Sequence, residues 1–137
     1  MERGTEDALV AGTIAAAVSG IPSTVWALGT GRDPLEATLA AGAIVLPEET
    51  QRARLLGAAV SVHVAVSFGW ALVLARMLPR GREVALGALA GLGIAAFDLG
   101  VVGRRFPRFR ALALVPQLAD HALYGATVGY VLARRRR

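Results

Sequence analysis

Five side chains that could do chemistry lie inside otherwise apolar stretches of the sequence. They are His63, Asp98, Gln117, Asp120 and His121, and the two histidines are the only ones in the chain. Imidazole titrates near neutral pH and exchanges protons with carboxylates, so these residue types suit a proton or ion relay. The two histidines could also ligate one haem iron axially, and the His/Asp set could hold zinc, although its spacing matches no zinc signature.

A structural role is the simplest interpretation of the same residues. Polar side chains between membrane helices commonly bond to one another and fix how the helices pack. The sequence supports neither a Ser/His/Asp or Cys/His catalytic arrangement nor a phosphate-binding glycine loop, and it contains no cysteine. We therefore expect no enzyme active site and predict no resident cofactor, with haem as the alternative.

The composition places these residues in a membrane protein. The 137 residues are 55% hydrophobic and only 18% charged, with a mean hydropathy of +0.53. A soluble domain usually carries about a quarter charged residues, and a small one needs them to cover its large relative surface. This composition argues against a soluble enzyme, a disordered chain, a disulfide-stapled module and a thiolate metal site.

The basic residues mark the ends of the apolar stretches. All 15 are arginines, and the net charge is +5. Their positions are typical of charges that stop spans at a membrane surface and bind lipid phosphates, so we expect lipid contacts and no nucleic-acid binding. One segment alternates arginines with aromatic rings, which indicates an interfacial belt or, alternatively, a docking surface for a partner protein or an anionic substrate. Its residues are Arg104, Arg105, Phe106, Arg108, Phe109 and Arg110.

Four apolar segments are long enough to cross a hydrocarbon core of about 30 Å. They span about 8–28, 55–78, 84–103 and 111–133. Pro22 should bend the first segment. The stretch 34–46 would reach only about 20 Å as a helix, which predicts a re-entrant or interfacial helix. The predicted fold is an all-α, integral membrane four-helix bundle, with residues 1–137 as a single domain.

Small residues at helical spacing predict where the spans touch. Gly12 and Ala16 lie on one face of the first segment, and Gly87 and Gly91 form a small-xxx-small pair on the third. A second such pair, Gly125 and Gly129, lies on the last segment. These faces could pack within one chain, or they could form the contact of a homodimer.

An alternating bundle would bring the chemistry-bearing residues to one level. His63, Asp98, Asp120 and His121 all fall in the half of the membrane that faces the 104–110 loop. From this convergence we predict a polar cluster in that half. Our functional prediction is an accessory or assembly subunit of a larger membrane system; the alternatives are a proton- or ion-coupled carrier and a bis-His haem protein.

The predicted location is the cell membrane, with both termini in the cytoplasm. The number of arginines is nearly equal on the two sides of the predicted bundle, and the arginine tail 134–137 favours this orientation. The partners implied are membrane lipids and either a second membrane protein or further copies of the chain.

Several short stretches are similar to those of a protein class. They are the stretches 20–24 (GIPST) and 31–37 (GRDPLEA), 98–100 (DLG) leading into 104–107 (RRFP), and Pro116–Gln117 with Asp120, His121 and Gly125. In these the chain resembles small, uncharacterised four-span integral membrane proteins of high-GC bacteria. The resemblance implies a multi-pass domain of unknown function and transfers no activity.

Overall fold

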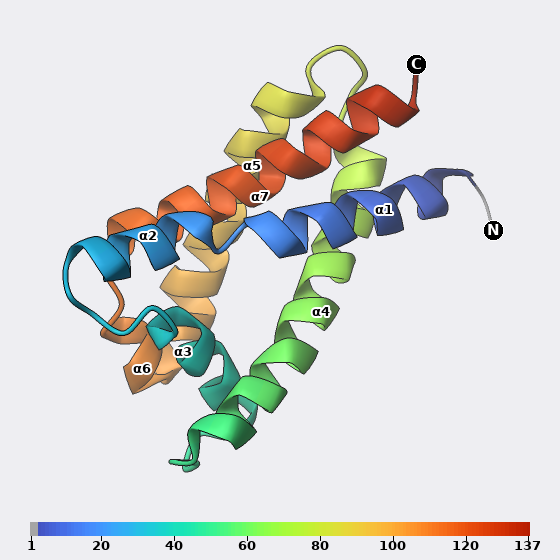
Figure 1. The fold of residues 1–137 in the computed structure, drawn as a ribbon. Coiled ribbons are helices and arrows are strands. Elements are labelled where there is room, and N and C mark those ends of the chain that lie inside the picture. The colour runs from blue at the N-terminus through green and yellow to red at the C-terminus, as the bar shows by residue number, and fades with distance from the viewer. Residues whose placement is uncertain (1–2) are drawn as a thin grey trace.

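The computed structural model describes residues 3–137, and most of them are helical (Figure 1). The helices are α1 (Arg3–Val18), α2 (Ile21–Gly29), α3 (Glu36–Val45), α4 (Arg52–Met77), α5 (Glu83–Phe97), α6 (Pro107–Arg110) and α7 (Leu114–Arg135). A π-helical turn, η1 (Asp98–Val102), and a 3-10 turn, η2 (Gly103–Arg105), connect α5 to α6. No strand occurs in this part of the chain, which confirms the all-α prediction.

Three helical segments are long and apolar enough to cross a membrane. They are Gly4–Gly29, which combines α1 and α2, Arg52–Met77, which is α4, and Glu83–Arg105, which continues α5 through η1 and η2. The shorter apolar helix α3 has 10 residues and covers only about 15 Å, too little to span. The chain is therefore a helical membrane bundle with three candidate spans and one short apolar helix.

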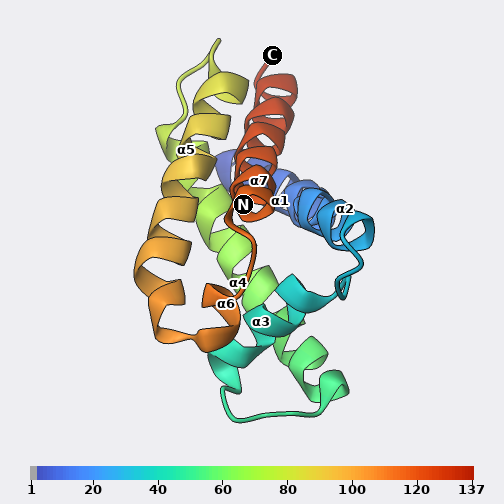
Figure 2. The ribbon, with the colours of Figure 1, turned by 90° about the vertical axis from the view of Figure 1, so that its left-hand side faces the viewer.

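The fourth predicted span differs from the other three. The structure begins α7 at Leu114 rather than at residue 111, after the separate short helix α6, and α7 is not among the helices apolar enough to span. It lies at the centre of the bundle instead, against α5, α1 and α2 (Figures 1 and 2). A helix that faces protein on several sides does not need an apolar surface all round, so it can carry polar residues.

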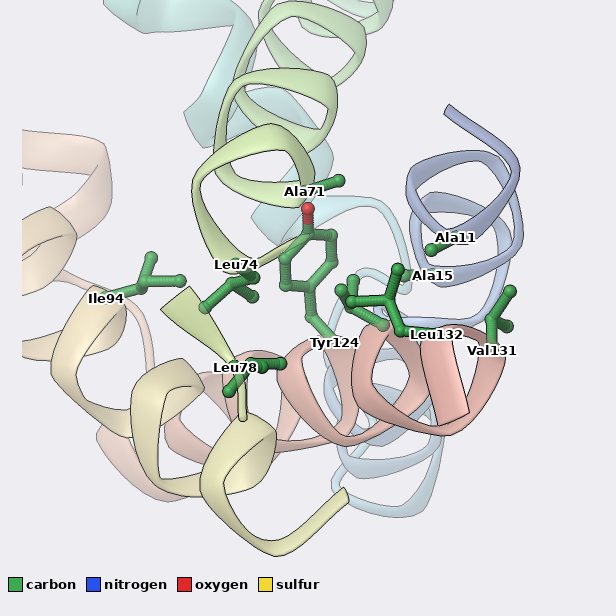
Figure 3. Close-up of a cluster of buried hydrophobic side chains, with 10 residues drawn as sticks. Ala11, Ala15, Ala71, Leu74, Leu78, Ile94, Tyr124, Val131 and Leu132 are labelled. Carbon is green, nitrogen blue, oxygen red and sulfur yellow. The ribbon is translucent and has the colours of Figure 1, made fainter. Parts of the chain in front are cut away.

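The main apolar core lies where α1, α4, α5 and α7 meet. Figure 3 shows Tyr124 pointing from α7 toward α4, with Ala11 and Ala15 of α1 on one side and Ile94 of α5 on the other. The Tyr124 hydroxyl donates a hydrogen bond to the backbone oxygen of Ser67. The small alanines let α1 approach α7 closely, so one large aromatic side chain fills the space that the four helices share.

The first span is broken before its proline. The helix α1 ends at Val18, and α2 begins at Ile21, which makes Pro22 the second residue of the new helix. Proline has no backbone N–H to donate to the preceding turn, so it fits in the first turn of a helix and not in its interior. The bend expected at Pro22 therefore lies three residues earlier along the chain, and both halves run along α7 (Figure 1).

Charged contacts join the start of α1 to the end of α7 at one end of the bundle, which we call the terminal end (Figure 1). On α7, Arg135 Nε lies 2.6 Å from Asp7 Oδ1, and Arg135 Nη2 lies 3.3 Å from Glu6 Oε1. The neighbouring Arg136 donates through Nη1 to the backbone oxygen of Leu78 at 3.1 Å, just beyond the last residue of α4. The start of α1 and the ends of α4 and α7 thus lie together.

The opposite end of the bundle, which we call the loop end, gathers the segments 30–35, 46–51 and 103–113. Arg52 at the start of α4 forms an ion pair with Asp33. Arg108 of α6 donates through Nη2 to the backbone oxygen of Glu49 at 3.2 Å. The short helix α3 lies here against the first turns of α4, in line with the helix predicted over 34–46.

Candidate functional site

The closest contact between ionisable side chains inside the bundle joins α5 to α7. His121 Nε2 lies 3.3 Å from Asp98 Oδ2, and both side chains are about one-quarter exposed. The other ring nitrogen, His121 Nδ1, lies 2.8 Å from the backbone oxygen of Gln117, one turn earlier on α7. Asp98 is the first residue of the π-helical turn η1, a type of distortion that is frequent at functional sites.

The hydrogen-bond partners of His121 fix the number of protons at this contact. A backbone carbonyl only accepts, so Nδ1 must carry a proton that it donates to Gln117. The contact between Nε2 and the Asp98 carboxyl then requires a second proton, located on either the nitrogen or the oxygen. The hydrogen bond of the Asp98–His121 pair therefore holds one shared proton, on His121 Nε2 or on Asp98 Oδ2.

Glycines position this pair by bringing the backbones of α5 and α7 into contact. A Cβ added to Gly91 would lie 2.0 Å from the backbone oxygen of His121, and one on Gly87 would lie 2.2 Å from that of Gly125. A Cβ on Gly129 would lie 2.1 Å from the oxygen of Glu83. The two glycine pairs singled out in the sequence thus face each other within one chain.

Asp120 points to a different helix from its neighbour His121. Its Oδ1 accepts a hydrogen bond of 2.9 Å from the backbone N–H of Ser23, in the first turn of α2. The residue before α2, Gly20, offers no side-chain cap to the free N–H groups of that turn. Asp120 therefore acts as an N-cap supplied from α7, where its negative charge also meets the positive end of the α2 dipole.

His63 makes a third, separate contact. Its Nε2 donates to the backbone oxygen of Ala16 at 2.8 Å, which links α4 to α1. Gly12, one turn earlier on α1, also faces α4, since an added Cβ would lie 3.0 Å from Ala71 Cβ. Both Gly12 and Ala16 therefore lie in the α1–α4 contact.

The predicted polar cluster is therefore divided among three helix contacts. His63 and His121 lie at comparable depth, one turn from the Tyr124–Ser67 contact, but they bond to different helices. Within residues 3–137, no group of three or more His, Asp and Glu side chains is placed to hold a metal ion. His121 Nε2, the ring atom available to an iron, faces Asp98.

The arginine–aromatic segment 104–110 folds into η2 and α6 at the loop end. Arg104, Arg105 and Arg110 are exposed, whereas Phe106 and Phe109 are half-buried, with Phe109 close to Gly103. The rings are thus partly covered by the protein, whereas Arg104, Arg105 and Arg110 are exposed and Arg108 donates to Glu49. This arrangement suits both a headgroup-level belt and a docking surface.

Sequence reasoning missed a row of small residues on α4, which we call the α4 ridge. It consists of Gly57, Ser61, Ala65 and Gly69, all of them exposed. The buried residues of α4 lie on the opposite face. A Cβ added to Gly57 or Gly69 would meet nothing within 4 Å in the described chain. The spacing of four residues could have identified the ridge, as it did the pairs on α5 and α7.

Other missed contacts had weaker signals in the sequence. On α3, an added Cβ at Gly42 would lie 2.0 Å from the backbone oxygen of Leu55, so this glycine sets the α3–α4 distance. At the terminal end, buried Glu83 accepts a 2.7 Å hydrogen bond from the N–H of Gly81, whose φ of +89° favours glycine. Neither residue belongs to a spaced pattern that would have marked it.

Comparison of the chain with protein-family models, with curated proteins and with solved structures finds no match. The contacts and exposed faces described above are therefore the basis for its functional interpretation.

Proposed function

We propose that this protein is a four-span membrane protein that serves as an accessory subunit, binding a second membrane protein along the α4 ridge. The four spans are α1 with α2, α4, α5 with its π-helical extension, and α7. The exposed α4 ridge is the observation that carries this proposal.

The dimensions and contacts of α7 support its role as the fourth span. Its 22 residues extend about 33 Å, enough to cross the hydrocarbon core. It runs from the loop end, where α6 precedes it, to the terminal end, where Arg135 and Arg136 contact α1 and α4. Gln117 is buried, and Asp120 and His121 bond to neighbouring helices, which lowers the cost of polar groups in the membrane.

The use of small residues elsewhere in this chain supports the role of the α4 ridge. Glycines four residues apart on α5 and α7 lie at the most extensive helix contact in the bundle. The α4 ridge repeats that spacing along three successive turns, yet it faces away from the rest of the chain. In lipid, such a surface promotes helix association because the backbones can approach closely. A transmembrane helix of another protein is the occupant that we propose.

The polar groups inside the bundle support a structural role for the core. Within residues 3–137, every fully buried side-chain nitrogen and oxygen has a hydrogen-bond partner. Asp120, His63 and Tyr124 each bond to a backbone atom of another helix. Contacts of this kind stabilise one arrangement of the spans, as a rigid binding partner requires.

The test is the recovery of the partner from native membranes in a mild detergent, with the tagged protein as bait. We expect a stoichiometric membrane protein to co-purify with the wild type and to be lost with Ala65→Leu, which places a large side chain on the ridge. Val66→Leu is the matched control, because Val66 is an exposed neighbour off the ridge and should retain the partner. Recovery of only monomer or homodimer contradicts the proposal.

A proton-coupled carrier is the second candidate, and the proton shared by Asp98 and His121 favours it. In liposomes that carry an imposed pH gradient, Asp98→Asn should reduce proton flux to the level of empty liposomes. Asp120→Asn is the matched control, since an amide oxygen can still accept from Ser23 and flux should persist. Wild-type flux equal to that of empty liposomes excludes this candidate.

A further inference from the structure

The terminal end of the bundle contains an open hollow of about 580 Å³ with a strongly basic lining. Its charged residues are Arg76, Arg80, Arg135, Arg136, Arg137 and Asp7. Five guanidinium groups and one carboxylate therefore surround a space of the size that small-ligand sites usually have.

Only part of this positive charge is compensated within the described chain. Arg135 is paired with Asp7 and Glu6, and Arg136 donates to the carbonyls of Ala75 and Leu78 near the end of α4. Those carbonyl groups do not neutralise a guanidinium charge. Within residues 3–137, neither Arg80 nor Arg137 forms an ion pair with an Asp or Glu side chain. Their planar guanidinium groups, each with several donors, remain available for an anionic ligand.

The hollow lies at the level where a span leaves the membrane. Arg76 is in the last turn of α4, and Arg135 is in the last turn of α7. About one turn earlier on α7, Tyr130 is exposed, and the Arg134 guanidinium lies over its ring, 5.3 Å from the ring centre. Tyrosine and arginine at the end of a span are typical of the headgroup layer. Lipid phosphates lie in this layer.

We propose that this hollow binds the headgroup of an anionic phospholipid, taken from the surrounding bilayer. The phosphate accepts hydrogen bonds from Arg80 and Arg137, while Arg76 and Arg136 add positive charge. Met77 is 72% exposed next to Arg76 and offers an apolar surface to the acyl chains. The bound lipid joins the ends of α1, α4 and α7, and the excess positive charge disfavours headgroups that carry a cation of their own.

The experiment measures which lipids the protein retains. The protein is reconstituted in nanodiscs that contain phosphatidylglycerol and phosphatidylcholine, and the retained lipids are identified by native mass spectrometry after release into detergent. We expect selective retention of phosphatidylglycerol by the wild type. The double variant R80Q/R137Q should weaken that retention about thirty-fold, given about tenfold for each 1.4 kcal/mol and about 1 kcal/mol for each arginine near an anionic surface.

The matched control is R82Q/R134Q, which removes the same charge from the same end but from residues outside the hollow. We expect it to retain phosphatidylglycerol as the wild type does. An equal loss in both double variants would show general attraction to the membrane surface and would overturn the proposal. Displacement of the lipid by millimolar inorganic phosphate would overturn it as well, because the site would then recognise a soluble anion. Neither outcome bears on the α4 ridge.

Discussion

Asp120 illustrates how this chain tolerates a carboxylate inside the helical bundle. Its oxygen accepts the Ser23 N–H in the first turn of α2, a group that Gly20 leaves without a side-chain cap. The backbone N–H that the break between α1 and α2 exposes and the carboxylate of Asp120 on α7 therefore form one hydrogen bond. The chain interrupts a helix beside its proline, and a distant side chain satisfies a backbone donor that the interruption frees.

The first prediction tests this cap. Asp120→Ala should destabilise the protein by about 1 kcal/mol, since it removes an N-cap hydrogen bond and a favourable helix-dipole interaction. Asp120→Asn should lose less, because its amide oxygen can accept the same bond. The free energy of unfolding is measured by titration with sodium dodecyl sulfate in mixed micelles. If Asp120→Asn is as damaging as Asp120→Ala, the hydrogen bond is not the stabilising contact.

Polar contacts between two side chains can be predicted from the sequence more readily than contacts between a side chain and the backbone. Asp98 and His121 lie on the small-residue faces of their helices, so their proximity could be inferred from spacing once those faces were paired. His63 and Asp120 instead bond to backbone atoms of Ala16 and Ser23. Every residue carries such atoms, so the sequence contains no signal for which of them a polar side chain will meet.

The second prediction concerns Asp33 at the loop end. Hydrogen bonds from the Arg52 guanidinium and from the Leu35 N–H hold the pKa of the Asp33 carboxyl below its usual range. A carboxyl pKa lowered by folding contributes stability above its ordinary value of about 4. That stability is lost as the pH falls through the lowered pKa. Arg52→Gln should therefore raise the pKa of Asp33, as measured by carboxyl-carbon NMR titration.

Glu49 provides an internal control in the same spectra. Its pKa is also lowered, first by the Gln51 N–H and then by Arg54 and the Thr50 N–H, none of which involves Arg52. Its titration should be the same in the wild type and in Arg52→Gln. An Asp33 titration that does not move in the variant would show that Arg52 does not hold the carboxylate in its charged form.

At the scale of elements, hydrophobic periodicity and segment length predict where the helices lie. They predict less well where those helices are interrupted. The apolar stretches identified α4 and the body of α5, and the prolines delimited α3. The π-helical turn at Asp98 had no such signal, and the short helix α6 had only the proline at its first position, Pro107. The low hydropathy of α7 follows from its central place, which only the packing of the other helices reveals.

The third prediction tests the contact between α5 and α7. Gly91→Ala should destabilise the protein by about 1 to 3 kcal/mol, because a Cβ there overlaps the backbone oxygen of His121 and forces the two helices apart. Gly93→Ala is the matched control on the same helix. An added Cβ there meets nothing within 4 Å, and alanine favours the helix, so stability should stay unchanged or rise slightly. Unfolding is measured in the same mixed micelles.

A similar loss for both α5 variants would show that backbone contact does not determine how α5 and α7 pack. A loss for Gly91→Ala alone would also assign the glycine pairs to packing within one chain. The homodimer interpretation of the same pairs requires them to be exposed. They are buried between α5 and α7 instead.

At the scale of the whole molecule, the two ends of the bundle differ in how many of their arginines have a carboxylate partner. At the loop end, Arg32, Arg52 and Arg54 each pair with a carboxylate, whereas the four arginines of the segment 104–110 have no such partner within residues 3–137. At the terminal end, both ion pairs use the single residue Arg135, although several other arginines lie nearby. Each end has seven arginines whose side chains the structure describes; six of them at the terminal end and four at the loop end lack a carboxylate partner, so the terminal end leaves more positive charge uncompensated. An uncompensated positive end suits the anionic lipids of the cytoplasmic leaflet.

The last prediction follows from this asymmetry and from the proposed span α7. The chain has no cysteine, so single cysteines can report the side of the membrane without background. With a membrane-impermeant maleimide added to intact cells, Thr30→Cys and Thr50→Cys at the loop end should react at once. Thr5→Cys and Arg137→Cys at the terminal end should react only after permeabilisation. The reverse pattern would keep four spans but invert the orientation, whereas labelling of Arg137→Cys together with Thr30→Cys would mean that α7 does not cross the membrane.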